Sequence, residues 1–93
     1  MKNKKLSSIR NKIDKVDNDI FILIKKRTTI VKHMLMLKRY KKQNVDQTRI
    51  KSILSSIRKK SIQNNIDPKI TSKIWKSIIW SYVEFQRRNF KKK

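Results

Sequence analysis

The chain has 93 residues, and its 27 Lys and Arg against 6 Asp and Glu give a formal net charge of +21. A chain of this length supports one domain and buries about two-thirds of its unfolded surface, so its core is small unless copies associate. The absence of Cys and Gly excludes disulfides, thiolate zinc sites and glycine-rich phosphate loops. No apolar run approaches a membrane span or the core of a signal peptide. We therefore expect a soluble, cytoplasmic, all-helical protein.

The positive charge has two possible explanations. A pI near 10.9 is typical of nucleic-acid-binding proteins. However, 20 of the 27 cations are Lys, and the chain is also rich in Ile (15) and Asn (7), residues whose codons are rich in A and T. A compositional bias of this kind accounts for many of the lysines at solvated positions. The seven Arg are more informative, because the same bias would replace an Arg without a function.

A heptad-like apolar stripe predicts one long helix over residues 5–41. The stripe consists of Leu6, Ile9, Ile13, Val16, Ile20, Leu23, Ile30, Met34 and Leu37. A helix of about 36 residues is about 54 Å long, whereas a compact globule of this size is about 32 Å across. The far end of the helix therefore needs a second chain to cover it, and we expect an intertwined homodimer.

A second helix is predicted over residues 46–63. Asp46 is a favourable N-cap residue at its start. Its apolar face consists of Ile50, Ile53, Leu54 and Ile57. This face fades near Ser61, and the pair Asn64–Asn65 indicates a loop.

A third helix is predicted over residues 68–90. Asp67 followed by Pro68 is a strong start signal, because Asp caps the helix and the fixed φ of Pro suits the first helical position. Its apolar residues include Ile70, Ile74, Trp75, Ile78, Ile79, Tyr82, Val83 and Phe85. No internal repeat or change in composition divides the chain, so we expect a single helical domain over residues 1–93.

Several polar side chains occupy positions where the helical pattern otherwise has apolar ones. Arg27 interrupts the stripe of the first helix, where a buried guanidinium requires an anion. Lys38 follows 11 residues later, so it faces the same way about 16 Å along the axis. Gln86 lies on the apolar stripe of the third helix, and Arg49 lies beside that of the second. A structural ion pair for Arg27, a solvent-reaching Lys38 and a satisfied core amide for Gln86 are the alternatives to a ligand site.

Together, these cations and the amide are typical of a pocket for a small dianion that also carries an oxygen acceptor. The set offers no candidate base, nucleophile or metal ligand, and we expect neither a metal nor a cofactor. Such a site catalyses only reactions that proceed by binding, conformational selection and electrostatic stabilisation.

These residues and their spacing resemble the all-helical chorismate mutases, in order and over nearly the whole chain. The matching segments are Leu6–Asp17, Ile24–Arg27, Lys38, Val45–Arg49, Ile66–Pro68 and Ile78–Gln86. A coiled-coil periodicity alone would not produce this combination. The resemblance implies an intertwined three-helix dimer with two active sites, which rearranges chorismate to prephenate.

The resemblance also implies the substrate-binding residues, which are Arg10, Arg27, Lys38, Asp46, Arg49, Tyr82 and Gln86. Arg27, Lys38 and Gln86 among them would act directly in catalysis. In the family, the first Arg reaches into the partner's site. The spacing agrees, because Arg10 and Arg27 are 17 residues apart, about 25 Å along one rigid helix.

Other functions stay open. Ile50 stands where many mutases carry a Glu, and Tyr82 stands where many carry a small hydroxyl residue. Both features are similar to the isochorismate-pyruvate lyases, relatives of the same fold that form salicylate, so isochorismate is an alternative substrate.

A basic helical nucleic-acid-binding protein and a membrane-surface helix are alternatives of other classes. Against the first, no helix-turn-helix signal is present, and Trp75, Trp80 and Tyr82 lie at helical spacing rather than among exposed arginines. Against the second, three amphipathic segments are better explained by burying one another. We expect a small-molecule substrate and a homodimer, with no specific nucleic-acid partner and no membrane partner.

Overall fold

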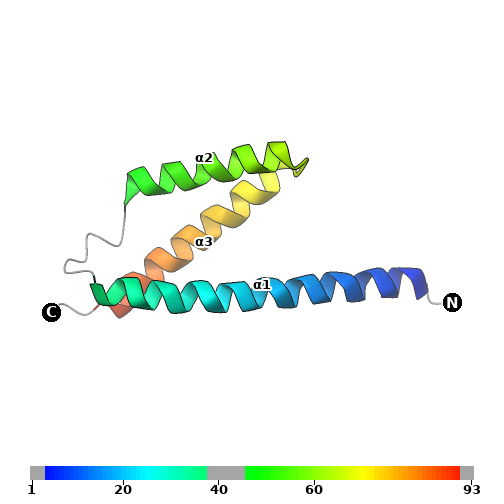
Figure 1. Ribbon diagram of the computed structural model, residues 1–93, viewed down its shortest axis with the longest axis horizontal. Coiled ribbons are helices and arrows are strands. Elements are labelled where there is room, and N and C mark those ends of the chain that lie inside the picture. The colour runs from blue at the N-terminus through cyan, green and yellow to red at the C-terminus, as the bar shows by residue number, and fades with distance from the viewer. Residues whose placement is uncertain (1–3, 38–45, 91–93) are drawn as a thin grey trace. The chain divides into compact units, whose positions relative to one another are not determined.

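The computed structural model describes residues 4–37 and 46–90, which form three helices (Figure 1). α1 spans Lys4–Leu37, α2 spans Gln47–Gln63 and α3 spans Pro68–Asn89. These described residues contain no strand, so the predicted all-α class is confirmed. Positions 38–41, where the first helix was predicted to end, lie outside the described residues. None of the described helices is both long and apolar enough to cross a membrane.

The chain divides into two compact units, Met1–His33 and Met34–Lys93. The boundary falls inside α1, which continues as one helix across it. The second unit contains the α2–α3 hairpin, in which the two helices pack on each other. A single domain over residues 1–93 stays a prediction.

Both short helices begin at aspartate caps, as predicted. Oδ1 of Asp46 accepts the backbone N–H of Arg49 at 3.0 Å, and Oδ1 of Asp67 accepts that of Lys69 at 2.9 Å. Each bond satisfies one of the N–H groups that the first turn of a helix leaves without an intrahelical partner. Pro68 occupies the first turn of α3, where its missing N–H costs nothing.

The turn between α2 and α3 is closed by backbone hydrogen bonds. The N–H of Ile66 donates to the carbonyl oxygen of Ser61 at 2.8 Å, and that of Asn65 donates to Ile62 at 3.3 Å. This is the Schellman pattern, which requires a left-handed residue after the helix. Asn65 takes that conformation with φ 57°, because the chain contains no Gly and Asn tolerates this region better than most residues.

A hydroxyl pair links the two helices of the hairpin near this turn. Ser61 Oγ donates to the carbonyl oxygen of Ile57 at 2.6 Å and lies 2.6 Å from Thr71 Oγ1. The Thr71 hydroxyl also lies 3.4 Å from the carbonyl oxygen of Pro68, so either hydroxyl can be the donor in the pair. Ser61 is only 3% exposed. The apolar face of α2 therefore does not simply fade at this point but gives way to a buried polar contact.

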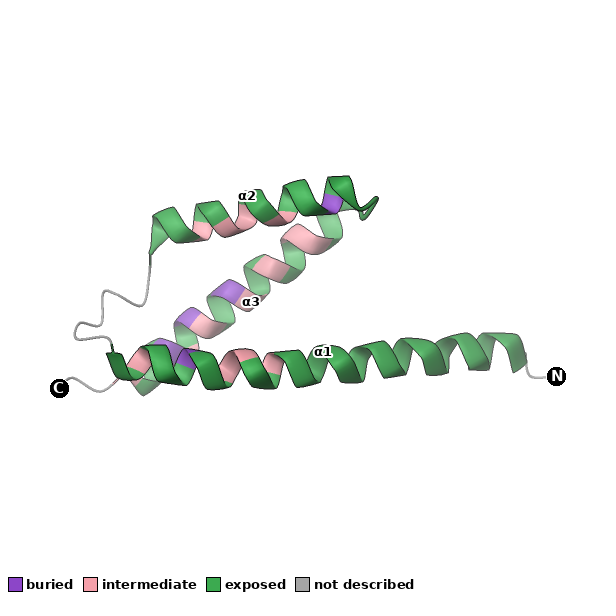
Figure 2. Ribbon diagram, in the orientation of Figure 1, coloured by how far each residue is buried: buried purple, intermediate pink, exposed green. Residues whose placement is uncertain are grey.

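Burial is distributed unevenly along the chain (Figure 2). The buried residues are Val31, Ser61, Ile79, Val83 and Gln86. Along α1, by contrast, no residue before Val31 is buried. The members of its apolar stripe, Leu6, Ile9, Ile13, Val16, Ile20, Leu23, Ile30, Met34 and Leu37, are all exposed in the single chain. A row of exposed apolar side chains at helical spacing is typical of a surface that another chain covers.

Candidate active site

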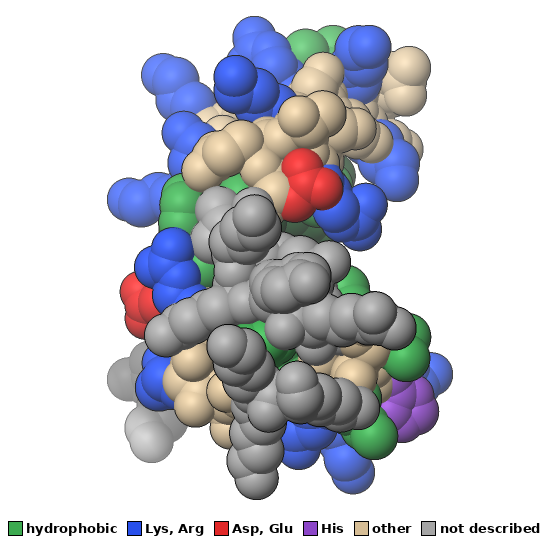
Figure 3. All heavy atoms as spheres, turned by 90° about the vertical axis from the view of Figure 1, so that its left-hand side faces the viewer, with side chains coloured by type: hydrophobic (Ala, Val, Ile, Leu, Met, Phe, Trp, Pro, Cys, Tyr) green, Lys and Arg blue, Asp and Glu red, His purple; other side chains and the backbone are tan. Residues whose placement is uncertain are grey.

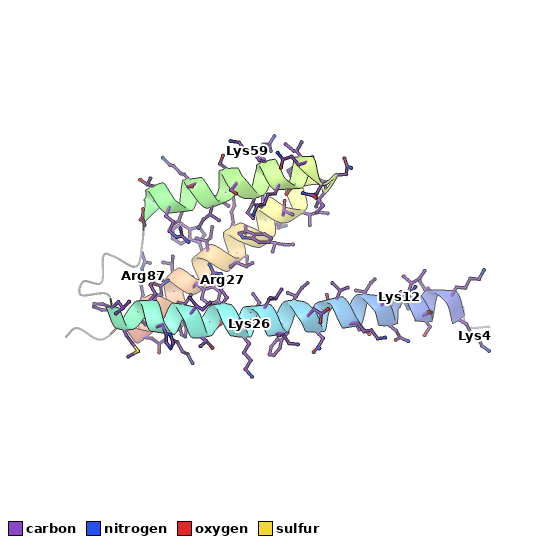
Figure 4. The ribbon with its side chains drawn as sticks, viewed as in Figure 1. Lys4, Lys12, Lys26, Arg27, Lys59 and Arg87 are labelled. Carbon is purple, nitrogen blue, oxygen red and sulfur yellow. The ribbon has the colours of Figure 1, made fainter. Side chains whose placement is uncertain are left out.

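Arg10 and Arg27 lie on one unbroken helix, α1. Their separation of 17 residues corresponds to about 25 Å along the axis, which is longer than a small-molecule ligand. Arg10 is exposed, whereas Arg27 is half-buried and its Nη1 is shielded from solvent. The side chains of Lys26 and Arg27 leave the helix in different directions (Figure 4). One copy of α1 therefore cannot bring Arg10 and Arg27 to the same small molecule.

The helix around Arg27 satisfies its own hydroxyl groups. Thr28 Oγ1 donates to the carbonyl oxygen of Ile24 at 2.8 Å, and Thr29 Oγ1 donates to that of Lys25 at 3.1 Å. Val31, one turn after Arg27 on the same face, is buried. Arg27 thus lies on the part of α1 that is withdrawn from solvent, unlike the exposed surroundings of Arg10.

The start of α2 brings Asp46 and Arg49 together. Both side chains are exposed, and the Asp46 carboxylate is engaged in capping the helix through the Arg49 backbone. Ile50, the next residue, is half-buried. Arg49 therefore presents a guanidinium at a rigid helix start, and the Asp46 carboxylate caps that helix.

The second half of α3 brings Tyr82 and Gln86 together, one turn apart on the same face. Gln86 is 6% exposed. Tyr82 is half-buried and makes an edge-to-face contact with Phe85, with ring centroids 6.3 Å apart. A buried amide is costly unless it is hydrogen-bonded, so the fold holds Gln86 in a defined environment.

Two sequence predictions about this region need comment. Lys38 lies outside the described residues. Trp80 was grouped with Trp75 and Tyr82 by its spacing, but it is 41% exposed whereas the other two are half-buried. The grouping of Trp80 with them is wrong. A rotation of 100° per residue puts Trp80 about 140° away from Trp75, which the sequence alone could have indicated.

The comparison with known proteins identifies the family. The family model described as chorismate mutase type II matches residues 9–87, a range that contains every predicted site residue from Arg10 to Gln86. The chain belongs to this family. The chorismate mutase of Methanocaldococcus jannaschii is 37% identical over 76 residues, which are 81% of this chain and 77% of that protein. No solved structure matches the chain.

Membership of the type II chorismate mutases confirms the resemblance drawn from the sequence and makes the protein an enzyme of the isomerase class. The described positions that the sequence predicts as the site provide guanidinium, phenol, amide and carboxylate groups. These groups bind anions and donate hydrogen bonds. Within residues 4–37 and 46–90, no group of three or more His, Cys, Asp and Glu could hold a metal ion.

Proposed function

We propose that this protein rearranges chorismate to prephenate, in a homodimer with two shared active sites. The observation that carries the proposal is the family match over residues 9–87, which includes the cationic positions and Gln86. The relative from Methanocaldococcus jannaschii, which bears the name chorismate mutase, supports the same reaction.

Binding selects the reactive shape of the substrate. Chorismate carries two carboxylates and an enolpyruvyl ether, and it must fold so that its two reacting carbons meet. Arg27 and Arg49 of one chain and the partner's Arg10 bind the carboxylates, which holds the compact conformer. The exposed Arg49 at its capped helix start and the half-buried Arg27 support this assignment, because each is held on a rigid element.

The chemical step needs no proton transfer and no covalent intermediate. One C–O bond breaks while one C–C bond forms within the same molecule, and the ether oxygen gains negative charge in the transition state. Lys38 and Gln86 donate hydrogen bonds to this oxygen, so they stabilise the transition state more than the ground state. The burial of Gln86 supports this role, because a donor shielded from water interacts more strongly with developing charge.

Two features of α1 support the proposed homodimer. Its apolar stripe is exposed along the helix in the single chain, so a second copy provides the missing cover. In addition, the about 25 Å between Arg10 and Arg27 requires two copies of α1 if both arginines serve one substrate. The same two-fold association therefore buries the stripe and completes each site.

Incubation of the purified protein with chorismate and, separately, with isochorismate tests the proposed reaction. We expect NMR to show prephenate formed from chorismate without release of pyruvate. The matched control is Arg27→Ala, purified in the same way and checked for helical content by circular dichroism. Any turnover by a contaminating enzyme would persist in this variant. Faster formation of salicylate and pyruvate from isochorismate would instead make the protein a lyase, and no turnover of either substrate would refute the proposed function.

A further inference from the structure

The outer face of α3 carries a row of cations that includes one tryptophan. We call this row the α3 basic stripe, and it consists of Lys69, Lys73, Lys76, Trp80 and Arg87. At 100° per residue, these side chains fall within about 60° of the helix circumference and extend over about 27 Å of its length. All of them are exposed. α3 therefore presents a narrow line of four cations and one exposed indole.

The α3 basic stripe lies beside the buried face of the helix and outside the proposed active site. The buried residues Ile79, Val83 and Gln86 lie on the adjoining face. The only acidic residue of α3 is Glu84, at the border of the stripe. Lysine is depleted from the centres of protein–protein interfaces, so the stripe is not where a second copy is expected to pack.

Compositional bias can explain a row of lysines but not the exposed tryptophan within it. A bias toward lysine at solvated positions can produce such rows elsewhere, and Lys4, Lys15 and Lys26 form one on α1. The row on α1 differs from that on α3 because α1 also carries Asp14, Asp17 and Asp19 and contains no tryptophan. Lys and Arg side chains are dispersed over the face that Figure 3 shows, so the exposed indole of Trp80 distinguishes the α3 basic stripe from other rows of cations.

We propose that the α3 basic stripe binds single-stranded nucleic acid without sequence specificity. Its cations are suited to neutralise phosphates, which releases counterions and gives a salt-dependent affinity. The exposed Trp80 ring is suited to stack on a base, an interaction that every base can make. No groove-reading element is involved, so the binding is independent of sequence. The proposal goes beyond the isomerase function and does not rest on it.

Fluorescence anisotropy with a labelled oligothymidylate of about 15 nucleotides tests the proposal. The stripe variant replaces Lys69, Lys73 and Lys76 by Gln, and the matched control replaces Lys4, Lys15 and Lys26 by Gln. Both remove the same charge from exposed positions, and the three control residues form a single row on α1 at 11-residue spacing. We expect the stripe variant to bind about tenfold more weakly at about 50 mM salt and to lower the salt slope by about two. The control should change affinity less than about twofold.

Tryptophan fluorescence shows whether the oligonucleotide binds at the α3 basic stripe. We expect oligothymidylate to quench the tryptophan emission of Trp75→Phe but not that of Trp80→Phe. Trp80→Ala should weaken binding about tenfold, while Ile70→Ala, an exposed apolar control off the stripe, should not. Equal weakening by the two lysine triples would mean that binding follows net charge alone and would overturn the proposal. Absence of binding at about 50 mM salt, or stronger binding to anionic lipid vesicles, would overturn it as well.

Discussion

α1 and the α2–α3 hairpin are held in their conformations in different ways. The hairpin is closed by contacts of its own, namely the caps at Asp46 and Asp67, the left-handed Asn65 and the Ser61–Thr71 hydroxyl pair. α1 has no buried residue before Val31, and its apolar stripe is exposed in the single chain. Most helical stability in proteins comes from packing an apolar face rather than from intrinsic propensity. The hairpin is thus stabilised by contacts within the chain, whereas α1 leaves exposed an apolar stripe that the proposed second copy would cover.

The two regions also differ in how they place the residues of the proposed active site. The hairpin brings its site residues together in pairs, Asp46 with Arg49 and Tyr82 with Gln86. α1 instead keeps Arg10 and Arg27 about 25 Å apart on one rigid helix. A helix that separates its predicted site residues in this way is suited to serve two sites, one at each end.

Charge on the α1 stripe should have the largest effect. Replacing both Ile13 and Ile20 by Lys places two charges where the second copy is proposed to pack, and burying an unpaired charge costs several kcal/mol. We expect sedimentation at micromolar concentration to show monomers and mutase activity to fall below detection. The control is Ile22→Lys, also exposed but on another side of α1, which should stay dimeric. A double variant that remains dimeric and active would contradict the assignment of the stripe.

Lys38→Ala should have the next largest effect. If Lys38 donates to an oxygen that becomes negative only in the transition state, kcat should fall about 10²–10³-fold, or about 3–4 kcal/mol, with a much smaller rise in KM. Lys38→Arg should recover only part of the loss, because a guanidinium does not reproduce the compact ammonium. Steady-state kinetics, with exposed Lys32→Ala as the control, measures both. A kcat within twofold of the wild type in Lys38→Ala would remove this residue from the mechanism.

Ser61→Ala should have a smaller effect, and on stability rather than on chemistry. The change removes a buried hydroxyl that bonds to Ile57 and pairs with Thr71, and we expect a loss of about 1–2 kcal/mol in the free energy of unfolding. For a domain of this size, Tm should fall by about 4–8 °C for each kcal/mol, at fixed protein concentration. Ser56→Ala, at an exposed position of the same helix, is the control. Equal Tm values for the two variants would mean that the hydroxyl pair contributes nothing.

Asp67→Ala should have the smallest effect. It removes the acceptor for the Lys69 N–H at the start of α3, and an N-cap of this kind contributes about 1 kcal/mol. Thermal unfolding should show a lower Tm than for Asp14→Ala, which removes an exposed acid from the interior of α1. A lower Tm in Asp14→Ala than in Asp67→Ala would contradict this role for the cap.

The features that could be predicted from the sequence are local ones. Asp46, Asp67 and Pro68 act on the helix starts next to them, so the starts of α2 and α3 were predicted within one residue. The family could be predicted because Arg10, Arg27, Arg49 and Gln86 keep a specific spacing. At Asn65 the sequence predicts a loop but not the left-handed conformation that the residue adopts.

Features that depend on contacts between helices could not be predicted in the same way. Ser61 was expected to lie where the apolar face of α2 ends, yet it is buried against Thr71, ten residues away across the turn. Nothing in the local pattern of α2 indicates which residue of α3 meets it. The exposure of Trp80 is different, because the sequence does contain its cause: five residues of helical rotation place Trp80 about 140° away from Trp75.

Mixing two inactive variants tests the shared site most directly. Arg10→Ala and Arg27→Ala chains, each inactive alone, should exchange subunits to form heterodimers in which one site carries both changes and the other carries neither. We predict that activity returns on mixing, up to about half of the wild-type value per heterodimer, because the intact site takes Arg10 from one chain and Arg27 from the other. Mass spectrometry verifies the exchange. No recovery of activity despite verified exchange would contradict the account.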